Sequence, residues 1–231
     1  MELLNHGEKL LHILRPVTDF LIKNNKDIVV PETDLSKPFG DITETFAECR
    51  KHFSKINPEI LQEFELKVAD NLIKKGERST FCLSSGEISV AGNQGVNDAV
   101  LSVGHELGHS VSMPTFFGDD YIDVYAEIPS HATERKLCGV MGLSKYNTCD
   151  HEIIRHLQWD SHLIDMNPNS RHVDEDLPYY IGGLFAVLVP HEELDHLYDK
   201  NYNQLQGIIS QIMADENRAI KTVEDYINID K

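Results

Sequence analysis

Apolar residues recur at helical spacing through the first third of the chain. They do so over residues 3–24, where Pro16 predicts a kinked helix or two short ones. A second helix is expected at residues 42–56. Asn57 and Pro58 break it, and a third helix is expected over residues 58–75 with proline in its first turn. The N-terminal part of the chain is therefore predicted to be helical.

The pattern changes after residue 76. Short β-prone segments at residues 79–83 and 87–92 flank a Ser-Ser-Gly turn, which predicts a hairpin or two strands of a sheet. A further helix is expected from about residue 97 and ends before Pro114. The pattern predicts mainly α structure with a small sheet beside this helix, followed by later helices at residues 123–141, 151–164, 179–189 and 203–227.

The helix expected from residue 97 contains a His-Glu-x-x-His pattern, formed by His105, Glu106 and His109. Both histidines lie one turn apart on the same helical face, so their imidazoles can reach one metal ion. Glu106 then lies beside the metal, where it can take a proton from a zinc-bound water. The spacing predicts a catalytic zinc site. Asp98 falls on the histidine face and could orient a ligand, or simply favour the helix N-terminus.

A catalytic zinc usually has three protein ligands, so one more is expected downstream. Glu127 is the favoured candidate, because its distance from His109 suits a loop and a returning helix. His131, one turn beyond Glu127, is the rival ligand, or it forms a hydrogen bond near the site.

These segments resemble the thimet oligopeptidase and oligopeptidase F family of gluzincin peptidases. The resemblance includes residues 75–82, residues 87–99 leading into the His-Glu-x-x-His pattern, and Glu-Ile-Pro-Ser from Glu127, closing with Glu134. His172 followed by residues 178–183 is similar to a later helix of that family. The likeness covers roughly residues 73–189.

The resemblance implies a zincin-like metallopeptidase domain that binds one zinc ion per chain and hydrolyses short peptides. It also implies residue roles. His105, His109 and Glu127 would hold the zinc, and Glu106 would activate water. Three residues of the later helix would stabilise the oxyanion or hold the substrate carbonyl: His172, Tyr180 and Tyr179.

The chain departs from the family pattern in three ways. It is far shorter than typical members, Ser112 stands where many have another histidine, and the gap from His109 to Glu127 is compact. These departures bear on a closed substrate channel and not on the zinc chemistry. We expect one compact domain over residues 1–231, with N-terminal helices at 1–72, the zinc-site core at 73–189 and C-terminal helices at 190–231.

Composition narrows the possible partners. The formal net charge of −17 argues against nucleic acid and anionic membranes as partners. No apolar run approaches the ~20 residues of a membrane helix, and the N-terminus lacks the pattern of a signal peptide. Four widely spaced cysteines predict free thiols. A cytoplasmic location is expected, and an open cleft would allow a homodimer that covers it.

The favoured function is a zinc-dependent peptidase that acts on short peptides or exposed protein segments. The strand at residues 87–92 could bind an extended peptide as an added strand. One alternative is a dedicated protease with a single protein target. The other is a catalytically silent zinc-containing module that binds peptides or proteins, although the intact Glu106 argues against it.

Overall fold

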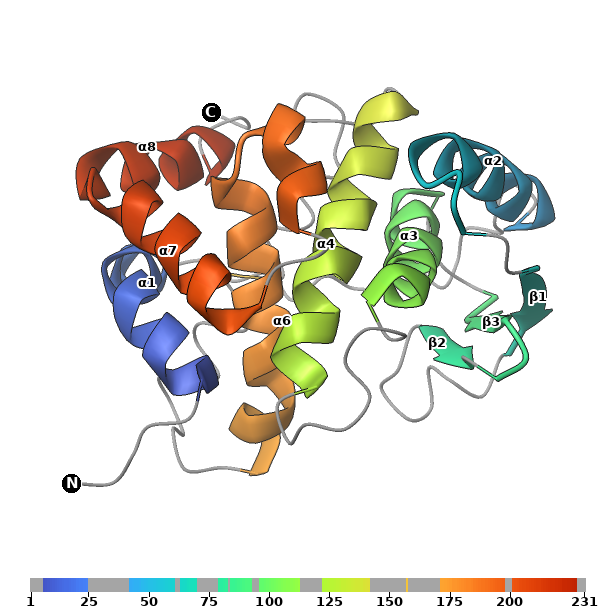
Figure 1. Ribbon diagram of the computed structural model, residues 1–231, viewed down its shortest axis with the longest axis horizontal. Helices are drawn as coiled ribbons and strands as arrows, with labels where there is room; N and C mark the ends of the chain where they lie inside the picture. The colour runs from blue at the N-terminus through green and yellow to red at the C-terminus, as the bar shows by residue number, and fades with distance from the viewer. Residues whose placement is uncertain are drawn as a thin grey trace.

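The computed structural model describes residues 6–24, 42–60, 63–69, 79–82, 84–92, 96–112, 122–141, 157, 171–197 and 201–227, except for the side chains of residues 96–98, 112, 122–125 and 171–176. Helices dominate these segments (Figure 1). Helix α4 (Ile122–Val140) lies at the centre, with α3 (Val96–Ser112) on one side and α6 (Arg171–Leu188) on the other.

The outer helices cover this central layer from both ends. Helix α2 (Ile42–Ile56) packs mainly on α3, and the 3-10 helix η3 (His191–Leu197) packs on α4. At the opposite end, α6 contacts α1 (His6–Lys23) and α8 (Glu216–Ile227). Helix α7 (Tyr202–Met213) completes this group by packing on α1 and α8 (Figure 1).

A three-stranded sheet lies beside α3, in the order β1-β3-β2. The central strand β3 (Glu87–Val90) pairs in parallel with β1 (Glu65–Val68) and antiparallel with β2 (Ser79–Cys82). The β2–β3 hairpin turns at Gly86, which has a positive φ of 71° that glycine adopts without strain. Because β3 is paired along both edges, it cannot take up a peptide as an added strand. That expectation for residues 87–92 is wrong, and β2 lies at the edge of the described sheet.

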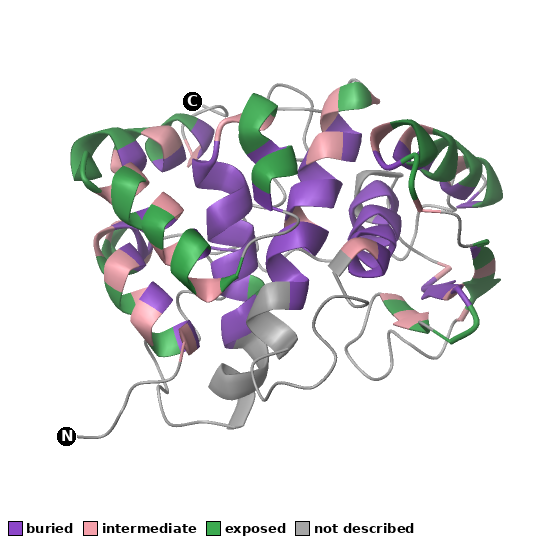
Figure 2. Cartoon of the chain, in the orientation of Figure 1, coloured by how far each residue is buried: buried purple, intermediate pink, exposed green. Residues whose placement is uncertain are grey.

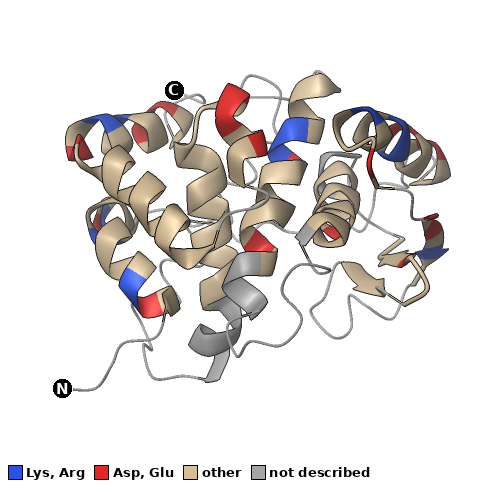
Figure 3. Ribbon diagram, in the orientation of Figure 1, with Lys and Arg blue, Asp and Glu red and all other residues tan. Residues whose placement is uncertain are grey.

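The buried apolar side chains of these elements form one contiguous cluster, which extends from α1 to α8. Figure 2 shows this burial concentrated in α3, α4 and α6. The outer helices bury one stripe each. In α1 the stripe has helical spacing and consists of Leu10, Leu14, Val17 and Leu21. Charged residues lie on the outer elements and on α4, while the part of α6 whose side chains are described contains none (Figure 3). None of the described helices has the length and apolar character needed to span a membrane.

Most of the predicted elements are confirmed, including the mainly α character, the helix at residues 42–56 and the β2–β3 hairpin. Helix α1 is one helix that continues through Pro16. Helix α6 begins at Arg171 and continues through Pro178, earlier than expected. The helix predicted at residues 203–227 is divided into α7 and α8. In the helix predicted at residues 151–164, only Leu157 lies within the described part of the chain.

The helix predicted over residues 58–75 is wrong. Its described part contains β1, whose four residues pair with β3. Glu, Leu and Lys all have good helix propensity, but propensity is a weak preference that tertiary contacts override. The strand is formed by hydrogen bonding to residues about twenty positions later in the chain, as the pairing of Glu65 with Glu87 shows.

Candidate metal centre

The site lies where α4 meets both of its neighbours, and glycines allow the close approach. A methyl group added at Gly108 of α3 would lie 2.5 Å from the Cα atom of Ser130 on α4. On the other side, a methyl group at Gly182 of α6 would lie 2.7 Å from the His131 ring and 2.9 Å from the Glu127 carbonyl oxygen. Larger residues at these two positions would push the helices apart. The glycines therefore bring side chains from three helices into one small space.

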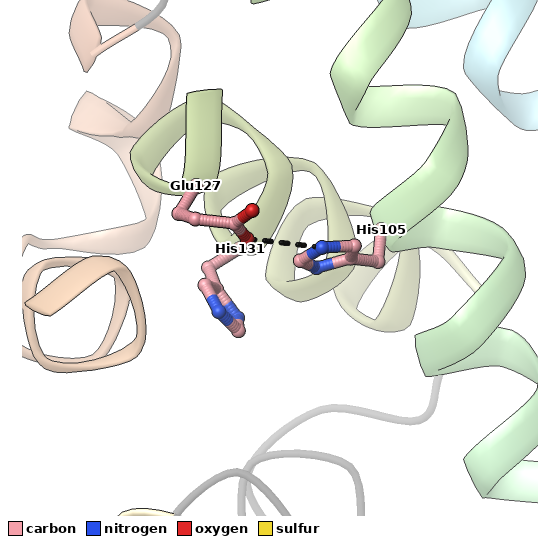
Figure 4. A group of neighbouring side chains, drawn as sticks. All are labelled: His105, Glu127 and His131. Atoms are coloured by element: carbon pink, nitrogen blue, oxygen red, sulfur yellow. Dashed lines mark ion pairs between the residues drawn. The ribbon is translucent and has the colours of Figure 1, made fainter. Parts of the chain in front are cut away.

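Three potential metal ligands converge there: His105 from α3, and Glu127 and His131 from α4 (Figure 4). Their candidate ligand atoms all lie within 4.8 Å of one another. The Nε2 atom of His105 is 3.0 Å from Oε2 of Glu127. His109 lies on the same face of α3 as His105, with its Nε2 atom 3.8 Å from Oε1 of Glu127. The structure therefore brings His105, Glu127 and the rival candidate His131 into one group, and places His109 beside Glu127 but outside that group.

One carboxylate holds two of these imidazoles. Glu134 is buried, and its Oε1 atom is 2.6 Å from Nδ1 of His105 while its Oε2 atom is 3.1 Å from Nδ1 of His131. An ionised carboxylate can only accept hydrogen bonds, so each ring donates its Nδ1–H to Glu134. When either ring loses its second proton, its lone pair is therefore on Nε2, the atom that a metal would bind.

The third imidazole is oriented by a serine instead. The Ser130 hydroxyl donates to the carbonyl oxygen of Ala126, at 2.8 Å, and lies 2.9 Å from Nδ1 of His109. Because a hydroxyl has a single hydrogen, Ser130 must accept the Nδ1–H of His109. His109 therefore has the same tautomer as the other two rings and presents Nε2 toward Glu127.

Buried polar atoms of the site indicate that it can hold a metal ion. Within the described part of the chain, three buried polar atoms of the site make no hydrogen bond: Nε2 of His105, Oε2 of Glu127 and Nε2 of His131. Leaving a buried polar atom unsatisfied costs roughly 1–3 kcal/mol. A cation among these atoms would satisfy all three, and imidazole nitrogen with carboxylate oxygen is a donor set that suits zinc.

The electrostatics of the site also favour a cation. Burial opposes ionisation of Glu127 and Glu134, but the neighbouring histidines outweigh it and lower both carboxyl pKa values. Burial likewise disfavours a charged His105, yet the two carboxylates raise its pKa well above the usual value. Burial and the nearby His105 charge lower the pKa of His109 to about 4. The site thus holds two ionised carboxylates, which stabilise positive charge between them.

Glu106 lies next to the cluster and is itself buried, with 4% of its surface exposed. Burial raises the pKa of its carboxyl group to about 7, against the opposing effects of His105 and of a hydrogen bond with Ser79. Ser79 begins β2, so the Glu106 side chain lies near the edge of the sheet. A buried carboxyl group in this position is suited to exchange protons near neutral pH.

Helix α3 is buried on more sides than its periodicity predicts. Val100, Val103 and Leu107 face the core, as expected. The opposite face, with His105 and His109 each only 7% exposed, was expected to face a cleft. It is instead covered by α4, which packs closely on α3 at Gly104 and Gly108.

Of the two tyrosines predicted to support catalysis, Tyr179 lies at the cluster. Its ring stacks on His105 with centroids 5.7 Å apart, and 47% of its surface is exposed. The role predicted for Tyr180 is wrong, because this residue is fully buried and its hydroxyl donates to Thr18 of α1 at 2.9 Å. The side chains of His172 and Asp98 lie outside the described residues, although the backbone of each belongs to a helix.

Sequence reasoning missed the roles of Glu134 and Ser130 as hydrogen-bond partners of the ligands. The signal for Glu134 is helical spacing: Glu127, His131 and Glu134 are four and three residues apart, which places them on one face of α4. Ser130 gives no such signal, because its contact with His109 depends on how closely α3 and α4 pack. Comparison of the chain with protein-family models, with characterised proteins and with solved structures finds no match.

Proposed function

We propose that this chain is a zinc-dependent peptidase that hydrolyses short peptides or exposed protein segments. The observation that carries the proposal is the convergence of His105, His109 and Glu127 beside the buried carboxyl group of Glu106. Resemblance to the thimet oligopeptidase and oligopeptidase F family, on the motifs quoted above, supports the same chemistry and a zincin-like fold.

The residues would divide the reaction between them. A zinc ion held by the cluster would supply a Lewis acid that polarises the scissile carbonyl and acidifies water. Glu106 would take a proton from the attacking water and return it to the leaving amine. Charge that develops on the carbonyl oxygen needs a nearby donor, and Tyr179, partly exposed above His105, is the described candidate.

The β2 strand offers a place for the substrate backbone. It lies at the edge of the described sheet, and its first residue, Ser79, lies near Glu106. An extended peptide added along β2 would have its backbone held by main-chain hydrogen bonds close to the general base. Such binding would give affinity with little selectivity for side chains.

One observation favours a second function. Besides the three predicted ligands, His131 also presents a nitrogen to the cluster. A zinc ion with four protein ligands is typical of structural sites, whereas catalytic sites keep one position open. A catalytically silent zinc-containing module that binds peptides or proteins is therefore the alternative.

Removal and restoration of zinc test the proposal. The protein is dialysed against a chelator, divided, and assayed on a mixed peptide library with and without one equivalent of Zn²⁺, with cleavage read by mass spectrometry. We expect cleavage only in the restored sample, with one zinc ion per chain. Restored protein that binds zinc and leaves the library intact would favour the binding module. A single-target protease would then cut only its own protein substrate.

A further inference from the structure

His131 is enclosed in a way that fixes its ring toward the cluster. It lies one turn after Glu127 and one turn before Glu134, so all three share the face of α4 that meets α3. On the other side, its Cδ2 atom is close to the backbone of Gly182 on α6. Its ring centroid is 5.0 Å from that of His105. The ring therefore lies between two helices, beside the other ligands and not on the surface.

The hydrogen bonds of His131 leave one nitrogen free for a metal. Its Nδ1 atom donates to Oε2 of Glu134, at 3.1 Å. Its Nε2 atom is buried and has no hydrogen-bond partner among the described residues. A histidine that served only to fill space would be expected to satisfy both nitrogens. His105 shows the same arrangement, with Nδ1 on the other oxygen of Glu134 and Nε2 directed at Glu127.

From this geometry we infer that His131 is a fourth protein ligand, so that three imidazoles and one carboxylate can hold the metal. The inference rests on the metal site of the proposed function, but it does not depend on peptide hydrolysis. It assigns Glu134 as the positioning residue for two of the ligands, His105 and His131, through their Nδ1 atoms.

Four protein ligands have a consequence for turnover. A four-coordinate zinc with four protein donors has no position left for water, so peptide hydrolysis in the wild type requires one donor to leave reversibly during each turnover. His131 is the donor placed to leave. Its side chain is 15% exposed, against 9%, 9% and 8% for His105, His109 and Glu127. Its hydrogen bond to Glu134, at 3.1 Å, is also longer than the 2.6 Å bond of His105.

The first test counts imidazoles in the unmodified protein. X-ray absorption spectroscopy of the chain loaded with one equivalent of Zn²⁺ reports the number of histidine rings from their multiple-scattering signal. We expect three rings and no sulfur ligand. Two rings that both remain in His131→Gln would overturn the inference while leaving the proposed zinc site intact. Failure to bind zinc at all would overturn both.

The second test compares two variants that each remove a histidine. His131→Gln should lower zinc affinity by about 10-fold or more, because even outer hydrogen-bond partners of ligands typically contribute that much. His191→Gln is the matched control, since its buried Nε2 also has no partner among the described residues but faces Gly139, and no described group of metal ligands includes it. It should leave zinc affinity unchanged.

Cobalt provides the readout of coordination. With Co²⁺ in place of zinc, His131→Gln should shift the visible bands, because a water replaces one imidazole, and should gain an exchangeable water, and His191→Gln should show neither change. An unchanged cobalt spectrum and unchanged affinity in His131→Gln would overturn the inference. Three rings in the zinc protein together with no peptide cleavage, even in His131→Gln, would overturn the proposed function alone.

Discussion

The close packing of α3 on α4 can be tested with one added methyl group. In Gly108→Ala, the new Cβ atom would lie 2.5 Å from the Cα atom of Ser130 and 3.0 Å from Cβ of Thr133. Relaxed carbon–carbon contacts are about 3.5–4.0 Å, so the helices must separate by roughly 1 Å. The nearest obstacle is backbone, which cannot rotate aside as a flexible side chain can.

The magnitude follows from two opposing effects. Overpacking of a core typically costs about 1–3 kcal/mol, and a backbone obstacle places this case at the upper end. Replacing glycine by alanine within a helix returns about 1 kcal/mol. We therefore expect Gly108→Ala to lose about 2 kcal/mol of unfolding free energy. For a chain of 231 residues this lowers the melting temperature by roughly 4–8 °C.

The same substitution elsewhere serves as the control. Gly207 lies within α7, and a methyl group there would meet nothing within 4 Å. Gly207→Ala should raise the unfolding free energy by up to about 1 kcal/mol, so the two variants should differ in sign. Urea unfolding followed by circular dichroism measures both. A Gly108→Ala variant as stable as the wild type would refute the close approach of α3 and α4.

The packing prediction also extends to the metal. Ser130 orients His109, and Glu127 lies one turn away on the same helix. A shift of roughly 1 Å between the helices should therefore weaken zinc binding in Gly108→Ala by about 10-fold or more, as competition with a chelator would measure. Gly207→Ala should bind zinc as the wild type does.

Three further predictions address other parts of the chain. Glu134→Ala removes the acceptor of two imidazoles and should lower zinc affinity by about 10–100-fold, measured by chelator competition; equal affinity would contradict the positioning role. Hydrogen bonds from nearby serines lower the pKa of the exposed Cys82 thiol to about 7, so its alkylation rate should rise with pH about a midpoint near 7. The buried Cys49 thiol should be alkylated only after unfolding. A midpoint near 9 for Cys82 would contradict the lowered pKa. Arg135→Met leaves buried carbonyl groups at the end of α6 unpaired and should lower the unfolding free energy, measured with urea, by roughly 1–3 kcal/mol. Lys221→Met removes an exposed ion pair and should unfold like the wild type. Similar losses in both variants would refute the role of Arg135.

Much of the site was predictable because its signals are local in the sequence. His105, Glu106 and His109 share one turn of a helix, and the apolar residues opposite them predict which face meets the core. Glu127 could be proposed as well, since a returning helix places it against α3. The part that local signals miss is the way α4 covers the histidine face.

The errors share a physical cause, which is contact between residues distant in sequence. Strand β1 forms because β3 is available to pair with it, although its own residues favour a helix. Tyr180 follows Tyr179 directly, yet a helix turns about 100° per residue and Tyr180 therefore meets Thr18 on α1. The division between α7 and α8 depends on Asp215, whose carboxylate accepts the backbone N–H of Arg218 in the manner of an N-cap.

The most direct test of the proposed function removes the general base and keeps the metal. Zinc-loaded wild type, Glu106→Gln and the control Glu224→Gln, whose side chain is exposed on α8, are incubated with a mixed peptide library and read by mass spectrometry. We expect all three to hold one zinc ion, the wild type and Glu224→Gln to cleave equally, and Glu106→Gln to be slower by about 100-fold or more. Equal cleavage by Glu106→Gln, or none by the zinc-loaded wild type, would contradict a peptidase with Glu106 as its base.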